Sequence, residues 1–118
     1  MIARYSRPAM SAVWSDEHRL FLWLEVELAA TAAREARGLA PAGAAARIRG
    51  RARLDLERML AIEDEVRHDV IAFLSMVAES AGDDARHLHV GLTSSDLVDT
   101  ALACQIREAG GVLVPGLA

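Results

Sequence analysis

The stretch from Ser15 to Gly38 constrains the fold most strongly, because it predicts one long helix with apolar residues on two faces. Ser15 is a typical N-cap, Asp16 and Glu17 follow it in the first turn, and Gly38 comes just past the expected end. The first face carries Leu20, Trp23, Leu24, Leu28 and Thr31, and the second carries Leu22, Val26, Ala29, Ala30 and Ala33. A helix of this kind needs neighbours on two sides.

The rest of the chain predicts further helices and no sheet. A short alanine-rich helix is expected to run from Pro41 toward Arg49, and Asp55 can cap the next one. Asp69 is the expected N-cap of a helix that ends near Gly82. Apolar and polar residues never alternate over a length that would favour a strand, so the predicted fold class is all-α.

The last predicted helix follows residues 83–92, DDARHLHVGL, which have mixed charge and no period and are expected to form a loop or a short extended connection. Thr93 and Asp96 match the capping-box pattern that opens a helix. Gly110, Gly111 and Pro115 should weaken or end it. Few residues remain to cover its apolar faces, so we expect the chain to be the front piece of a longer one.

The composition limits the chemistry that the chain can perform. At 118 residues and 53% apolar content it fits one folded domain, and all 13 basic residues are arginine. The absence of lysine excludes Schiff-base chemistry, and the net charge of -4 argues against non-specific nucleic-acid binding. Cys104 alone cannot form a disulfide framework, and the most apolar segment is too short to span a bilayer. We therefore expect a cytoplasmic protein without a membrane partner.

Three polar motifs could bind a ligand, and the first is Arg67-His68-Asp69. The simplest interpretation is a helix junction, in which Asp69 caps, Arg67 pairs with Glu63 and His68 is half-exposed. The alternative is an anion site, since a guanidinium and the free N–H groups of a helix N-terminus jointly attract a carboxylate or phosphate. Both interpretations can hold together.

The second motif is the stretch HLHVGLTSSD, in which Thr93, Ser94 and Ser95 precede a helix. One hydroxyl can cap the helix and the others can turn toward an anion, although a capping box in a solvated turn is the simpler account. His87 and His89 would point the same way in an extended segment. No cysteine or carboxylate completes a zinc set with convincing spacing, so we expect no metal centre.

The third motif is Arg4-Tyr5 with Arg7 in the N-terminal arm. Such an arm is usually solvent-facing, but an arginine fork can bind two oxygens, and a tyrosine adds a ring and one O–H group. The sequence contains no nucleophile elbow, Walker loop or glycine-rich dinucleotide loop. A pocket lined by helix N-termini and guanidinium groups would suit a ligand with more than one negative charge.

Four stretches together carry a family resemblance: RYSRPAMSAVWSDEHR, WLEVELA, IEDEVRHDVIAF and HVGLTSSDLVDTAL. In this order and at these separations the chain resembles the N-terminal part of the adenylosuccinate lyase family, of the fumarase/aspartase superfamily. GLTSSD alone would indicate only the wider superfamily. The resemblance covers most of the chain, from near its first residue to about Leu102.

The resemblance implies a helical enzyme without a cofactor, assembled into a homotetramer when full length. It implies a first domain at residues 1–92 and the beginning of a central helix-bundle domain at residues 93–118. Family members eliminate fumarate from adenylosuccinate to give AMP, and from the succinylated ribotide SAICAR to give AICAR, in purine biosynthesis. The family's other catalytic histidine and its mobile serine loop lie far downstream and are absent, so we expect the isolated chain to be inactive.

Matching by motif also implies roles for individual residues. Arg4 and Tyr5 would bind the nucleotide. Arg67, His68 and Asp69 would line the substrate site, with His68 as the catalytic residue. Thr93 and Ser94 would hold the succinyl carboxylate, and His89 would lie in the same pocket.

Two alternatives to this interpretation stay open. The first is a non-catalytic helical module that packs or oligomerises and uses its polar motifs only as caps. If Ser94 is a cap, replacing it with alanine should cost about 0.5–2 kcal/mol of stability. The second alternative is another lyase of the same superfamily, acting on argininosuccinate, fumarate or a muconate, which the RYSRP opening disfavours.

Overall fold

The computed structural model describes residues 2–117, and within that range it contains helices and no strand. The α-helices are α1 (Pro8–Val13), α2 (Asp16–Glu35), α3 (Ala44–Arg51), α4 (Leu56–Val66), α5 (Asp69–Ala81) and α6 (Ser94–Leu113). Short 3-10 helices are η1 (Ala3–Tyr5), η2 (Gly82–His87) and η3 (Val114–Gly116). The predicted all-α class is confirmed.

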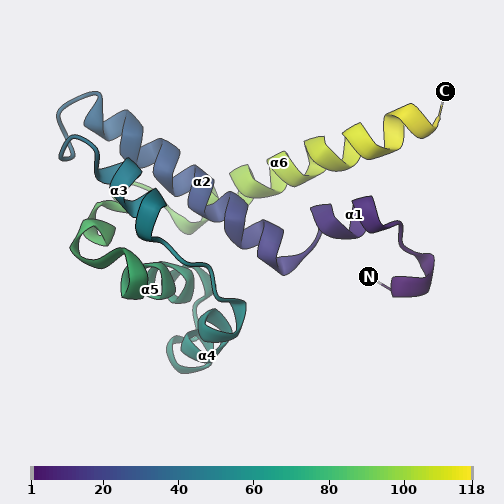
Figure 1. Cartoon of the computed structure of the whole chain (residues 1–118), viewed down its shortest axis with the longest axis horizontal. Coiled ribbons are helices and arrows are strands. Elements are labelled where there is room, and N and C mark those ends of the chain that lie inside the picture. The colour runs from purple at the N-terminus through teal and green to yellow at the C-terminus, as the bar shows by residue number, and fades with distance from the viewer. Residues whose placement is uncertain (1, 118) are drawn as a thin grey trace.

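Helix α2 lies at the centre of the molecule and contacts α1, α3, α4 and α6, while α5 packs against α3 and α4 (Figure 1). Its predicted first face is buried along its whole length, from Leu20 to Thr31. The second face is covered at Leu22, but Ala29 and Ala33 are exposed. The expectation of neighbours on two sides is therefore confirmed only for the first half of α2.

The core forms where α5 meets α2. Phe73 and Trp23 are almost fully buried, and their rings meet edge to face with centroids 5.4 Å apart. Met59 from α4, Ile48 from α3 and Leu97 from α6 complete the buried cluster around them. Aromatic residues of this size supply a large share of the apolar burial in a small domain.

Several predicted helix starts are confirmed by their capping bonds. The Ser15 hydroxyl accepts from the His18 N–H at 3.1 Å, and Asp55 caps α4 in the same way through Arg58. The short helix α3 begins at Ala44, later than the proline-led start that was expected, because Gly43 precedes it in the left-handed region at φ 78°.

The C-terminal part differs from the prediction in two ways. Helix α6 continues through Gly110 and Gly111 and ends at Leu113, just before Pro115 joins η3. The two glycines therefore do not end the helix, since their cost of roughly 1 kcal/mol each is outweighed by the packing and hydrogen bonds of the rest of the helix. No helix among residues 2–117 combines the length and apolar character needed to cross a bilayer.

Candidate active site

The first motif lies at the sharp junction between α4 and α5. Arg67 is the C-cap of α4 in the left-handed conformation at φ 55°, and its N–H donates to the Glu63 carbonyl at 2.7 Å. Its guanidinium pairs with Asp64 at 3.2 Å, three residues back, and the predicted pair with the Glu63 side chain is not observed among the described residues. The left-handed turn at Arg67 ends the helical geometry that an i,i+4 pair requires. The Arg67 side chain is therefore held only by an exposed ion pair and is available to a ligand.

His68, and not Asp69, is the N-cap of α5. The extended backbone of His68 lets its ring Nδ1 accept from the Ile71 N–H at 3.3 Å, while Asp69 is already the first helical residue. Asp69 accepts from the N–H of Val70 at 2.7 Å and lies 3.6 Å from His68 Nδ1. Because Nδ1 accepts a hydrogen bond, the neutral ring carries its proton on Nε2. His68 therefore presents a donor at the start of a helix.

The second motif opens α6 with the predicted capping box. The Thr93 hydroxyl accepts from the Asp96 N–H at 3.3 Å, and the Asp96 carboxylate accepts from the Thr93 N–H at 2.8 Å and its hydroxyl at 3.0 Å. These bonds, led by the one from the Thr93 backbone, lower the pKa of Asp96. No hydrogen bond of the Ser94 or Ser95 side chain is found within residues 2–117. Thr93 thus performs the structural role, and the two serine hydroxyls remain available.

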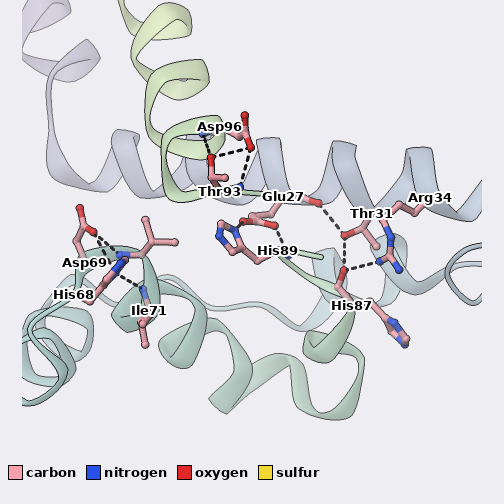
Figure 2. Close-up of polar contacts among 11 residues, drawn as sticks. Glu27, Thr31, Arg34, His68, Asp69, Ile71, His87, His89, Thr93 and Asp96 are labelled. Atoms are coloured by element: carbon pink, nitrogen blue, oxygen red, sulfur yellow. Dashed lines mark hydrogen bonds and ion pairs between the residues drawn. The ribbon is translucent and has the colours of Figure 1, made fainter. Parts of the chain in front are cut away.

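His89 is held by a carboxylate from the middle of α2. Glu27 is fully buried, and its two oxygens lie 2.6 Å from the His89 backbone nitrogen and 2.6 Å from the ring Nδ1 (Figure 2). The His89 side chain itself is 21% exposed. The Coulomb effect of His89 also contributes to the lowered pKa of Asp96 at the start of α6.

His87 does not share this environment. It ends η2, and its carbonyl accepts from the Thr31 hydroxyl and from Arg34, both at 3.3 Å. Residues 83–92 were expected to form a loop or a short extended connection. The 3-10 helix η2 occupies the first half and turns follow it, so the loop is confirmed only for the second half. An extended segment is not formed, because His89 takes a left-handed backbone at φ 57°. The prediction that His87 and His89 point the same way fails with it. No group of three or more potential metal ligands is found in residues 2–117.

Backbone strain marks two of the predicted site residues. Arg67 and His89 are the two non-glycine residues with positive φ within the described range. This conformation costs an ordinary residue about 1–2 kcal/mol and recurs at functional sites, where surrounding contacts enforce it. The strain therefore supports a functional role for both motifs independently of their residue types.

The third motif lies away from the other two. Arg4 stacks on the exposed Tyr5 ring at 4.8 Å, and Tyr5 and Arg7 line a shallow pocket with Leu113 at the end of α6. Thr93 lies at the other end of that 20-residue helix, about 30 Å away at 1.5 Å per residue. Figure 1 shows η1 and α1 on the same side of the molecule as the C-terminal half of α6. One copy of the chain therefore does not bring Arg4 and Tyr5 together with the α6 start.

Glu27 is the residue that the sequence analysis missed as part of the site. It occupies a position on the buried face of α2 between Trp23 and Thr31 and belongs to none of the three predicted motifs. A carboxylate in a core position needs a buried partner, because an unpaired buried charge is very costly. That pattern was visible in the sequence, but the identity of the partner, 62 residues away, was not.

Comparison with known proteins shows what the chain is similar to. No family model matches the chain. A solved structure, a fumarate lyase from Mesorhizobium sp. BNC1, superposes with a TM-score of 0.75 and 27% identity, covering 84% of this chain and 24% of its own. With its helical fold, the chain belongs to the fumarase/aspartase superfamily.

Two relatives of known function are adenylosuccinate lyases. The adenylosuccinate lyase of Bacillus subtilis is 46% identical over 117 residues, which is 99% of this chain and 27% of the relative. That of Synechocystis sp. is 50% identical over 106 residues, or 90% of this chain and 25% of the relative. The chain is similar to these adenylosuccinate lyases along nearly its whole length, and it spans about a quarter of theirs.

Proposed function

We propose that the chain is the part of an adenylosuccinate lyase that supplies two helix N-termini and two imidazoles to the substrate site. The reaction is the β-elimination of fumarate from adenylosuccinate to give AMP, and from SAICAR to give AICAR. The observation that carries the proposal is the pair of helix starts, with His68 at α5 and, at α6, the Ser94 hydroxyl, for which the described part of the chain shows no hydrogen bond. Identities of 44–50% to adenylosuccinate lyases support the choice of substrate.

The start of α6 suits the negative charge that develops in this elimination. Removing a proton next to a carboxylate gives an aci-carboxylate, with extra charge on its oxygens. Thr93 satisfies the N–H of Asp96. Within residues 2–117 no bond is found for the Ser94 hydroxyl or for the N–H groups of Ser94 and Ser95, and these groups can donate to that carboxylate. Losing one such preorganised donor typically raises a barrier by about 2.7–4 kcal/mol.

The α4–α5 junction suits the departing nitrogen and a second anionic group. In its neutral form His68 presents Nε2–H and can donate a hydrogen bond to the substrate. In its protonated form it can transfer a proton to the leaving nitrogen. Arg67 supplies a guanidinium from a fixed backbone, and Asp69 lies beside His68 as a carboxylate that stabilises a protonated ring. In this proposal His68 is the catalytic residue, and Arg67 and Asp69 belong to the substrate site.

The distant position of Arg4 and Tyr5 supports a site shared between subunits. If these residues bind the nucleotide, they must do so for a substrate held by another copy of the chain. The outer face of α6 exposes Leu102, Ile106 and Leu113 by 42%, 57% and 57%, as expected for a helix that packs into a larger bundle. We propose that residues 93–118 begin the central bundle of a homotetramer, that residues 1–92 precede it as a separate domain, and that the enzyme is cytoplasmic.

A chimera tests the proposed function. Replacing the matching segment of Bacillus subtilis adenylosuccinate lyase with this chain should give an enzyme that releases fumarate from adenylosuccinate. The same chimera with His68→Gln should lose at least about 100-fold in kcat, the lower range for a positioned acid–base group. A folded, tetrameric chimera without activity, or one indifferent to His68→Gln, contradicts the proposal. The 118-residue chain alone should show no turnover and should bind AMP or fumarate weakly or not at all by calorimetry.

A further inference from the structure

The buried carboxylate of Glu27 is not needed to explain the fold. It lies in the middle of α2, on the face that buries Leu24, Leu28 and Thr31, where an apolar residue would pack without cost. Burying a charged group costs free energy unless hydrogen bonds compensate it. All side-chain hydrogen bonds of Glu27 found within residues 2–117 go to a single residue, His89.

The two bonds together fix both the backbone and the ring of His89. One Glu27 oxygen accepts the His89 N–H at 2.6 Å and so holds a residue whose backbone is strained at φ 57°. The other lies 2.6 Å from Nδ1, and because an ionised carboxylate only accepts hydrogen bonds, Nδ1 must be the donor. The neutral ring then carries no proton on Nε2, which has no hydrogen-bond partner within the described residues.

This tautomer distinguishes His89 from His68 and His18. His68 accepts at Nδ1, and His18 binds Glu108 through Nε2 at 2.5 Å, so both carry the neutral proton on Nε2. His89 therefore presents an acceptor where His68 presents a donor. In the view of Figure 2 the His89 ring lies between Glu27 and the start of α5, where His68 is located.

We propose that Glu27 is a positioning residue that holds His89 with Nε2 unprotonated and turned outward, ready to accept a hydrogen bond from an O–H or N–H group of the ligand. His68 and His89 then form a donor and an acceptor on the same ligand. Only the identity of that ligand rests on the proposed function, because the tautomer follows from Glu27 alone.

The test is to measure the ring ¹⁵N chemical shifts of the histidines in the 118-residue chain. The spectra are recorded well above the ordinary histidine pKa of about 6.5, so that neutral rings dominate. His89 should show the Nδ1–H form in excess by at least about tenfold, given the strength of a hydrogen bond to a charged group. His18 and His68 should show the Nε2–H form and serve as internal references.

The variant Glu27→Gln sharpens the test. A carboxamide has one acceptor oxygen, and that oxygen is needed by the His89 N–H, so its NH₂ group faces Nδ1 as a donor. The variant should therefore invert His89 to the Nε2–H form. The control Glu25→Gln removes a carboxylate from the same helix, but one that pairs with Arg49 at the surface, and it should leave His89 unchanged.

An Nε2–H form of His89 in the unmodified chain would overturn the inference, since it would mean that a protonated Glu27 donates to Nδ1. So would a folded Glu27→Gln variant with the Nδ1–H form. If that variant does not fold, the spectrum of the unmodified chain still decides. The NMR measurement needs no turnover, so an Nε2–H form of His89 refutes the role of Glu27 and leaves the lyase proposal standing. An inactive chimera refutes the lyase proposal and leaves the role of Glu27 standing.

Discussion

Replacing Thr93 and Ser94 one at a time should separate the structural hydroxyl of the α6 start from the one available to a ligand. Thr93→Ala removes the cap bond to the Asp96 N–H at 3.3 Å and the hydroxyl bond to the Asp96 carboxylate at 3.0 Å. The bond from the Thr93 backbone to Asp96, at 2.8 Å, survives. Ser94→Ala removes no hydrogen bond found within residues 2–117.

These contacts determine how much each variant should lower the free energy of unfolding. Losing an N-cap side chain costs about 0.5–2 kcal/mol, and the long cap bond, the exposed site and the surviving backbone bond place Thr93→Ala near 1 kcal/mol. For a domain of this size that corresponds to a fall in Tm of about 3–6 °C. Ser94→Ala should stay within about 0.5 kcal/mol of the parent, as surface substitutions without such contacts do.

Urea unfolding followed by far-UV circular dichroism measures both free energies. The activity of the same substitutions in the chimera should run in the opposite order, with Ser94→Ala the more damaging to kcat/KM. Equal destabilisation by the two variants would show that Ser94 is itself part of the cap, and would refute the division of roles. A stable Ser94→Ala chimera with full activity would refute only the proposed role of Ser94 in binding the substrate.

Three further predictions concern stability. Phe73→Ala should cost about 3–5 kcal/mol in chemical unfolding, because it empties a fully buried site against Trp23, and a cost below 1 kcal/mol would contradict the assigned core. Arg67→Gly relieves the left-handed strain and should stabilise the chain by up to about 1 kcal/mol while weakening the chimera's catalysis; a large destabilisation would show that the side chain is needed for folding. The hydrogen bond from Arg47 holds the pKa of Asp84 below its usual value, so stability should be full above about pH 5 and fall as the pH drops through about 4 and below. Acid titrations of unfolding should show a shallower loss in Arg47→Met than in the parent, and an unchanged slope would exclude this pair as a contributor.

The helical elements could be predicted from sequence because their signals are local. The caps at Ser15, Asp55 and Thr93 and the apolar period of each helix depend on residues within a few positions of one another. The predicted cap of α5 was displaced by one residue, from Asp69 to His68, since a shift of one residue depends on the exact backbone path of the preceding turn. The same limit applies to Gly110, where tertiary packing outweighed a weak local preference.

The site could be predicted only as separate motifs. The sequence by itself determined which side chains are available: thirteen arginines without lysine, an imidazole at a helix junction and a row of hydroxyls before a helix. The tertiary structure alone decided which of them are fixed and in what protonation form. Glu27 reaches His89 across 62 residues, and Arg4 lies a full helix length from Thr93. Such pairings depend on how helices pack in three dimensions, and no local pattern of residues specifies that packing.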